Sequence, residues 1–437
     1  MNADLAPLAK ASGFFRRALF IYRTETGQSL VFWALIGLFH FAAQIVFRRE
    51  LKPGEFGTLN TAFGIIGLMT VPVLALNLAF MHYLARKHAD TQSARIESLR
   101  AATLPVTQTF AWIWGGLCLP LVFLLGALLD LPRFSLEFLT FSSVLVALGC
   151  VVSQAVCQDR NQLCLWAWLL AASALARVLM GAGLAWAQPW GESALAVFFL
   201  AGFIALSPVL ALREIGIATR LKACRAVQDR DFLLCAAATF SVLLALFLFS
   251  SADRIVAQCW FGVATSSNLR YVDWPGFDAY QTAGLLGRGI FWGTQPLLWI
   301  FFAQRSRMAR TTMASLTFLW IYVGALLLGA ILLGCLSQPL SRLFCGADFK
   351  STAALVPSFA AAMIPLGLLQ GVGIFVLASR RHPECFLLAG CAVGYVLLLF
   401  LVGRQPQVMP AYMFGGGLVA LMVVLFVSIV RWGRKQP

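Results

Sequence analysis

Two arginines interrupt long apolar stretches of the sequence. Arg177 lies in ASALARVLMGAG and Arg288 lies in AGLLGRGIFWGTQP. An arginine in the hydrocarbon core of a bilayer is costly unless it faces water, an acid or an anionic ligand. Its guanidinium group can bind a phosphate through two parallel hydrogen bonds. These arginines therefore indicate either a cationic cavity for an anionic substrate or charges that snorkel and hold helices together, and the sequence leaves both readings open.

Amide side chains recur in the same kind of apolar stretch. Each can form a hydrogen bond between neighbouring helices, and their spread over both halves of the chain suits a polar central cleft. The predicted cavity residues, in addition to Arg177 and Arg288, are Gln44, Asn77, Gln154, Gln295 and Gln370.

Acidic residues avoid the apolar stretches. Of the 18 Asp and Glu residues, only Asp253 touches the edge of one, and Arg254 follows it directly. We expect this pair either to fix a helix end on the outer side or to place Arg254 at the cleft with Asp253 steering it. Cation-coupled antiporters usually need a carboxylate within the bilayer. The pattern therefore disfavours a cation-coupled drug pump and predicts modest impairment from Asp253→Asn.

Histidines and cysteines show no metal-site or catalytic spacing. The four histidines are dispersed, and most of the eleven cysteines lie inside apolar stretches, where cysteine behaves as a small hydrophobic residue. We expect no catalytic residue, no metal, no cofactor and no enzyme activity.

Long apolar runs must position the polar residues. The chain has 437 residues, 60% of them hydrophobic and 12% charged, and its mean hydropathy is +0.83. A soluble protein of this composition would expose large apolar patches, whereas runs of about 20 apolar residues cross a bilayer as helices. The sequence thus predicts an all-α polytopic membrane protein. Twelve transmembrane helices are expected near 28–48, 57–81, 104–128, 135–157, 163–187, 191–212, 232–253, 280–303, 311–335, 351–378, 383–403 and 408–430.

Basic residues predict the orientation. With the N-terminus in the cytoplasm, roughly two thirds of the Lys and Arg residues fall in inner segments, as the positive-inside rule requires. Both termini are therefore expected to be cytoplasmic. The net charge of +15 then lies mostly at the inner membrane face, and no nucleic-acid partner is expected. A weak repeat, EFG at 55–57 and WFG at 260–262, each followed by a proline-containing span, favours two parallel halves.

We divide the chain accordingly. The predicted parts are a cytoplasmic lead-in (1–27), an N-terminal six-helix lobe (28–213), a cytoplasmic linker (214–231), a C-terminal six-helix lobe (232–430) and a cytoplasmic tail (431–437), with the two lobes around a central cleft.

Three segments resemble signatures of the polysaccharide and O-antigen flippases of the multidrug/oligosaccharidyl-lipid/polysaccharide (MOP) exporter superfamily. Residues 51–86, LKPGEFGTLNTAFGIIGLMTVPVLALNLAFMHYLAR, are similar to the span 1–2 signature. Residues 153–181, SQAVCQDRNQLCLWAWLLAASALARVLMG, resemble the span 4–5 segment, including its arginine. ADRIVAQCWFG (252–262) and AYQTAGLLGRGIFWGTQPLLWIFFAQRS (279–306) resemble the span 7–8 segment, although the intervening segment is longer than usual and the expected Pro-Arg ending is missing.

The resemblance implies a flippase in the bacterial inner membrane. Such a protein moves an undecaprenyl-pyrophosphate-linked oligosaccharide outward by alternating access, for polysaccharide, exopolysaccharide or O-antigen biosynthesis. Its implied partners are the lipid-linked saccharide, the lipid bilayer, and the polymerase and glycosyltransferases of the same pathway. Two alternatives stay open: an integral membrane glycosyltransferase or ligase, and a non-transporting subunit of a polysaccharide export complex.

Overall fold

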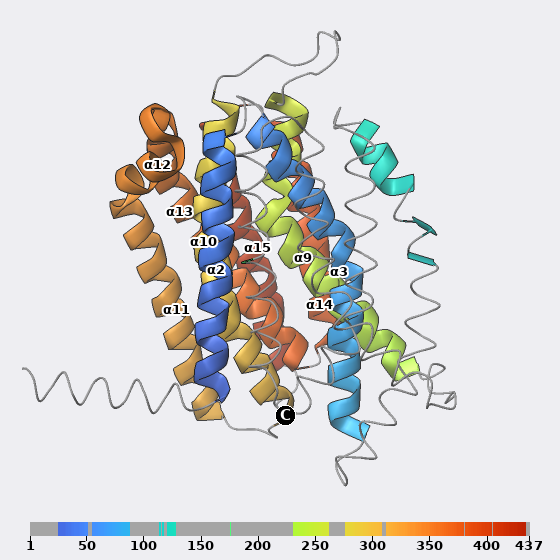
Figure 1. Cartoon of the computed structure of the whole chain (residues 1–437). Helices are drawn as coiled ribbons and strands as arrows, with labels where there is room; N and C mark the ends of the chain where they lie inside the picture. Colours follow the sequence, from blue (N-terminus) through green and yellow to red (C-terminus); the bar gives the residue numbers. More distant parts are fainter. Residues whose placement is uncertain are drawn as a thin grey trace, which may run out of the picture.

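The computed structural model describes residues 25–50, 55–87, 230–261, 276–307, 312–379, 381–403 and 405–433, together with 113–114, 116–117, 120–127 and residue 175. All of its described elements are helices (Figure 1). They are α2 (Glu25–Glu50), α3 (Glu55–Lys87), α9 (Arg230–Phe261), α10 (Phe277–Arg307), α11 (Thr312–Cys335), α12 (Ser337–Cys345), the short 3-10 helix η2 (Gly346–Asp348), α13 (Phe349–Ala378), α14 (His382–Val402) and α15 (Met409–Gly433).

The predicted spans in the described parts are helices. The ranges 28–48, 57–81, 280–303, 311–335, 351–378, 383–403 and 408–430 each fall within, or within a residue of, an observed helix. In the described part of the chain, seven stretches are long and apolar enough to cross a membrane. The expected spans 135–157 and 191–212 lie outside the described residues, 163–187 is described only at residue 175, and 104–128 is described only in small part.

The expected end of the span at 232–253 is wrong. Helix α9 continues past Asp253 to Phe261, so Asp253 lies about 12 Å before the helix end at 1.5 Å per residue. The hydropathy pattern ends at the first charged residue, but this carboxylate has a buried partner on another helix. Once the charge is paired, the helix can continue through apolar surroundings.

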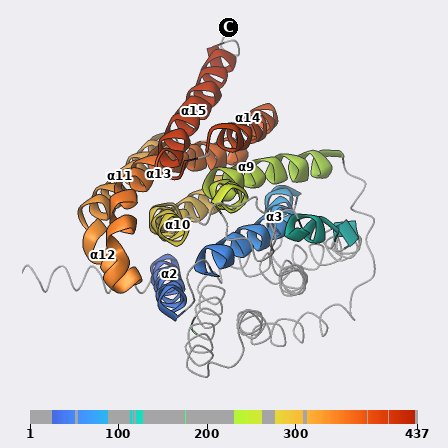
Figure 2. The same cartoon turned by 90° about the horizontal axis from the view of Figure 1, so that it is seen from above.

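Helix α10 lies at the centre of the described bundle, although it is the least apolar of the long helices. Seen from above, it lies between α2 on one side and α9 on the other, with α11 and α13 also beside it (Figure 2). Its first half, from Phe277 to Arg288, is buried throughout. Because other helices rather than lipid cover it, α10 can carry polar side chains that a lipid-facing helix could not.

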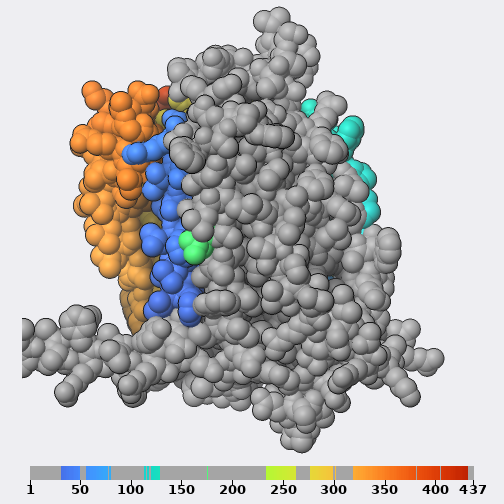
Figure 3. Space-filling view, in the orientation of Figure 1, coloured from blue at the N-terminus to red at the C-terminus, as the bar shows by residue number. Residues whose placement is uncertain are grey.

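Helix α2 links the two halves on the outside of the bundle. On the face shown in Figure 3 it lies at the surface, and the orange helix α12 lies beside it. Phe41 of α2 packs edge-on against Phe344 of α12, with ring centroids 5.9 Å apart. The first helix of the described chain therefore packs directly against the C-terminal half.

We expect reporter fusions to place both termini in the cytoplasm. Fusions after Lys87, Arg225 and Arg310 should report the inside, and fusions near Leu51 and Tyr271 the outside, because the basic segments stay in the cytoplasm. Paired alkaline phosphatase and green fluorescent protein fusions measure this. An outside signal at Arg225 would contradict the division into two parallel six-helix lobes.

Candidate functional site

A buried ion pair joins α9 and α10. Arg288 Nη1 donates hydrogen bonds to both carboxylate oxygens of Asp253, at 3.0 Å to Oδ1 and 2.9 Å to Oδ2. Neither side chain has any exposed surface. Removing two charges from water is costly, and their attraction repays that cost only with good geometry and further hydrogen bonds. The pair is therefore a specific feature of the bundle interior.

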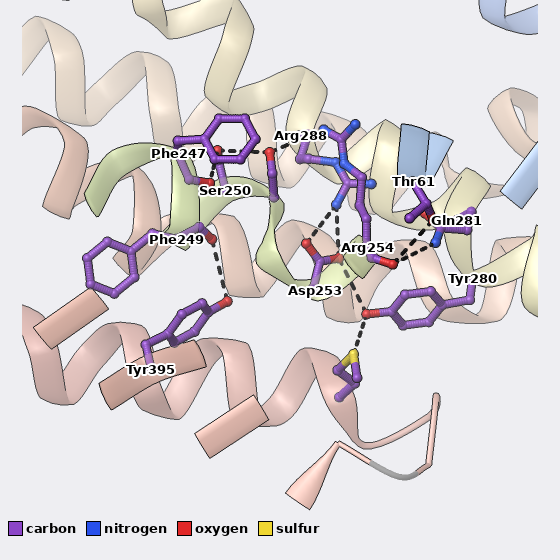
Figure 4. A network of polar contacts seen from close by, with 12 residues as sticks. Thr61, Phe247, Phe249, Ser250, Asp253, Arg254, Tyr280, Gln281, Arg288 and Tyr395 are labelled. Carbon is purple, nitrogen blue, oxygen red and sulfur yellow. Dashed lines mark hydrogen bonds and ion pairs between the residues drawn. The ribbon is translucent and has the colours of Figure 1, made fainter. Parts of the chain in front are cut away.

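Two tyrosines support this pair from neighbouring helices. The Tyr280 hydroxyl lies 3.4 Å from Asp253 Oδ2 and 2.7 Å from the sulfur of Met409. Figure 4 shows Asp253 between Arg288 and Tyr280. The Tyr395 hydroxyl of α14 donates to the backbone oxygen of Phe249, one turn before Asp253, at 3.4 Å. Helices α10 and α14 thus both contact this part of α9, and Met409 at the start of α15 contacts Tyr280.

Arg254 is a second buried cation beside the pair. Arg254 is only 4% exposed. Its Nη2 lies 3.4 Å from the Ser251 hydroxyl, and its guanidinium carbon is 5.5 Å from the centre of the Trp292 ring. Among the described residues it has no ion pair within 4 Å, and its Nε has no hydrogen-bond partner. Together with Asp253 and Arg288 it gives the cluster a formal net charge of +1.

Arg288 keeps one side of its guanidinium group unused. Nη1 makes both contacts with Asp253, whereas the buried Nε and Nη2 have no hydrogen-bond partner among the described residues. These two nitrogens form one fork of the planar group, the geometry that binds two oxygens of a phosphate or carboxylate. Buried donors without partners are rare in native proteins and commonly mark a site for water or a ligand. The unused fork is therefore suited to an anion.

Gly284 provides space for this fork. A Cβ atom at position 284 would lie 3.0 Å from Arg288 Nη2 and 3.2 Å from Cε1 of Phe359 on α13. Glycine, one turn before Arg288 on α10, allows the guanidinium group to lie against the helix. A larger residue would have to push the guanidinium group or the Phe359 ring aside.

Further unpaired amides lie on the helices where the two halves meet. In the described part of the chain no hydrogen-bond partner is found for either amide atom of the fully buried Asn60 on α3, or for the Oε1 atoms of Gln281 and Gln44. The Arg254 carbonyl accepts hydrogen bonds from Gln281 Nε2 and from the Thr61 hydroxyl, each at 3.4 Å. A polar seam therefore runs between α3, α9 and α10.

The predicted cavity residues that the structure describes lie in different parts of the bundle. Arg288 is at the centre of the cluster, and Gln44 on α2 and Gln295 on α10 are partly buried. Gln370 is apart: its Oε1 lies 3.4 Å from the Tyr322 hydroxyl, which donates to the Gly367 carbonyl at 2.6 Å between α11 and α13. Arg177, Gln154 and the side chain of Asn77 lie outside what the structure describes.

The expected helix-end pair of Asp253 and Arg254 is wrong. Both residues lie inside α9, and the partner of Asp253 is Arg288 rather than its neighbour in sequence. Adjacent residues on a helix point about 100° apart, so side chains at i and i+1 do not face each other. The acid that seemed to lie at the membrane edge is thus a carboxylate inside the bundle.

Sequence reasoning missed Tyr280 and Gln281 as site residues. Both side chains are fully buried in the bundle. A signal was present: Tyr280 precedes Arg288 by eight residues, which brings both to the same side of a helix. The stretch AYQTAGLLGR contains that spacing.

Solved structures share this architecture, whereas no family model and no curated protein sequence matches the chain. An inward-facing MATE family transporter of the MOP superfamily has a TM-score of 0.62 at 14% identity, covering 95% of this chain and 100% of that chain. A eukaryotic MATE transporter gives 0.67 at 12% identity, covering 95% and 96%. The lipid II flippase MurJ, in an inward closed conformation, gives 0.62 at 14% identity, covering 92% and 87%.

The chain has the MOP fold. The expected all-α class and the resemblance to the MOP superfamily are confirmed at the level of fold. The chain is a multi-pass membrane protein. The matched proteins with the MOP fold are transporters and a flippase, not enzymes. In this fold the helices α3, α9 and α10 carry the polar seam, while the polysaccharide flippase subfamily stays a prediction.

Proposed function

We propose that this protein is a flippase for an anionic lipid-linked saccharide. It binds the diphosphate of the lipid carrier at Arg288 and Arg254 and moves the headgroup across the membrane by alternating access of the two lobes. The observation that carries the proposal is the buried and unused Nε–Nη2 fork of Arg288. In a low-dielectric interior with a net positive charge, an anion with two accessible oxygens is the complementary ligand.

Asp253 has a defined role in this proposal. It neutralises Arg288 while the site is empty, and it leaves the Nε–Nη2 fork available for substrate. When a diphosphate binds, Arg254 supplies the second cation without having to break an existing ion pair. Outward movement of an anion also gains from an inside-negative potential, about 2.3 kcal/mol per charge per 100 mV if it crosses the whole field.

The proposed flippase function also implies where the protein acts in the cell. We place the protein in the bacterial inner membrane with both termini in the cytoplasm, where lipid-linked saccharides are made. Its proposed partners are glycosyltransferases that build the substrate and a polymerase that uses it on the outer side. Polysaccharide or O-antigen biosynthesis is the process that this activity serves.

A cation-coupled exporter is the second candidate. It is favoured by the position of Asp253, which is a carboxylate inside the bundle rather than at the membrane edge. Intramembrane carboxylates commonly bind the coupling ion of pumps and transporters. In this alternative Arg288 would be the ion-pair partner of Asp253 between transport cycles.

A reconstituted flipping assay tests the proposal. The probes are a fluorescent short-chain prenyl diphosphate linked to one sugar, and the same molecule with an uncharged ether in place of the diphosphate. We expect the purified protein in liposomes to move the diphosphate probe at least tenfold faster than the uncharged one. Equal rates for both probes would overturn the proposal. Movement of only an organic cation, driven by a proton or sodium gradient, would instead support the second candidate.

A further inference from the structure

The end of α2 and the starts of α3 and α10 lie at the upper end of the bundle in Figure 1, and the Asp278 carboxylate joins them. Asp278, in the first turn of α10, accepts a hydrogen bond from the backbone N–H of Gly57 at 2.8 Å. Gly57 is in the first turn of α3, where backbone N–H groups have no partner within the helix. Asp278 therefore caps α3 from a different helix, and its charge suits the positive end of the α3 dipole.

The end of α2 contributes two arginines to the same region. Arg48 Nη1 lies 3.7 Å from Asp278 Oδ2, and both side chains are largely buried. Arg49 Nε donates to the Leu343 carbonyl at 3.0 Å, in the last turn of α12. The carbonyls of a last turn lack partners within their helix, and a cation there is favourable. Adjacent arginines thus bind two different helices of the C-terminal half.

Close packing brings the helix ends together. The ring of Phe277 on α10 occupies the space that a Cβ atom of Gly57 would need. The Arg48 guanidinium carbon lies 5.8 Å from the centre of the Phe56 ring. A glycine at position 57 is therefore required for α3 to approach α10 this closely.

Apart from the Arg48–Phe56 contact, these contacts join the N-terminal half to the C-terminal half. Helices α2 and α3 belong to the first, and α10 and α12 to the second. We propose that Arg48, Arg49, Gly57, Asp278 and Leu343 form an interlobe latch that holds this end of the transport pathway closed, and that opens when the two halves separate there. In the predicted orientation this is the outer end. The latch rests on the proposed function, because only an alternating-access protein must open and close it.

Substitutions in the latch can remove one or both of the Asp278 contacts with the N-terminal half. Asp278→Asn keeps an oxygen that can accept the Gly57 hydrogen bond but loses the ion pair with Arg48, and Arg48→Gln loses the same ion pair from the other side. Asp278→Ala loses the ion pair and the cap together. If the latch controls opening, the first two variants should behave alike and the third should open further.

Hydrogen–deuterium exchange of the full-length protein in lipid nanodiscs tests this without any substrate. For Asp278→Asn and Arg48→Gln we expect at least fivefold faster exchange at the starts of α3 and α10 and, together with them, at the end of α9. The end of α9 is diagnostic, because it belongs to the seam between the halves, where Gln258 lies 3.3 Å from the Thr61 hydroxyl. Arg49→Gln, which removes the contact with α12, should raise exchange in the same three segments.

Arg431→Gln is the matched control. Arg431 forms an ion pair with Glu384 at 3.6 Å, between α15 and α14 and so within one half. Its loss should leave exchange in the three segments unchanged. Faster exchange confined to the first turn of α3, or no change in the Asp278 and Arg48 variants, would overturn the latch. Concerted exchange in a protein that fails the flipping assay would keep the latch and refute only the proposed substrate.

Discussion

Asp253→Ala is expected to leave little folded protein in the membrane. The change leaves Arg288 as a buried guanidinium group without the one acid that it pairs with among the described residues, next to the second buried cation Arg254. Removing one member of a buried ion pair commonly destabilises a protein by about 3–5 kcal/mol. The sequence alone predicts only a modest effect of Asp253→Asn, whereas the position of the carboxylate inside the bundle predicts a severe effect when Asp253 is removed. Membrane abundance and thermal unfolding in detergent measure the loss.

A double variant separates stability from function. Asp253→Leu combined with Arg288→Met replaces the pair by apolar side chains, which is often neutral or stabilising for buried pairs. We expect abundance near the wild-type level but no flipping of the diphosphate probe.

Glu384→Ala, at a pair whose arginine is 48% exposed, should change stability by about 1 kcal/mol or less. Normal abundance of Asp253→Ala would contradict the structural role of the pair.

Arg288→Lys is expected to fold but to transport at least tenfold more slowly than the wild type. The lysine keeps a positive charge for Asp253, so the carboxylate does not lose its partner. It lacks the planar fork of Nε and Nη2, and an ammonium group cannot bind two phosphate oxygens in the same geometry. Transport of the diphosphate probe and membrane abundance should be measured side by side. A purely structural arginine would show the two falling together.

Gly284→Ala tests the same fork with Arg288 intact. The added methyl group would lie 3.0 Å from Nη2, so the guanidinium group must shift, and we expect transport to fall several-fold with little loss of abundance. Gly293→Ala is the control on the same helix, since a Cβ atom there meets nothing within 4 Å. Wild-type transport by both Gly284→Ala and Arg288→Lys would contradict an anion site at Arg288.

Hydropathy was sufficient to predict the helices but not their ends at charged residues. The described spans are where the apolar runs predict them, because a bilayer demands about 20 apolar residues from any lipid-facing helix. The end of α9 was missed, since a partner on another helix made its charge tolerable. A pairing between residues 253 and 288 depends on how two helices pack, and no local pattern contains that information.

The candidate site was predictable only in part. Arg288 was identifiable as an arginine in an apolar run. Gln370, selected by the same logic, hydrogen-bonds in the α11–α13 interface instead. Both choices rest on the cost of a polar group in lipid, which is the same for a ligand-binding residue and for one that only joins helices. To tell a ligand-binding residue from one that only joins helices, the partner of each side chain must be known.

The burial of α10 has a consequence for how the protein is made. It carries Asp278, Arg288 and several amides, and it is not among the seven stretches that are apolar enough to cross a membrane on their own. A single arginine or aspartate at a helix centre opposes insertion by the translocon by roughly 2.5–3.5 kcal/mol. Helix α9 is synthesised just before α10 and presents Asp253, which can neutralise Arg288 as a hairpin forms. We therefore expect α9 and α10 to enter the bilayer as one unit. The buried ion pair of Asp253 and Arg288 then forms early, while the protein is being inserted into the membrane.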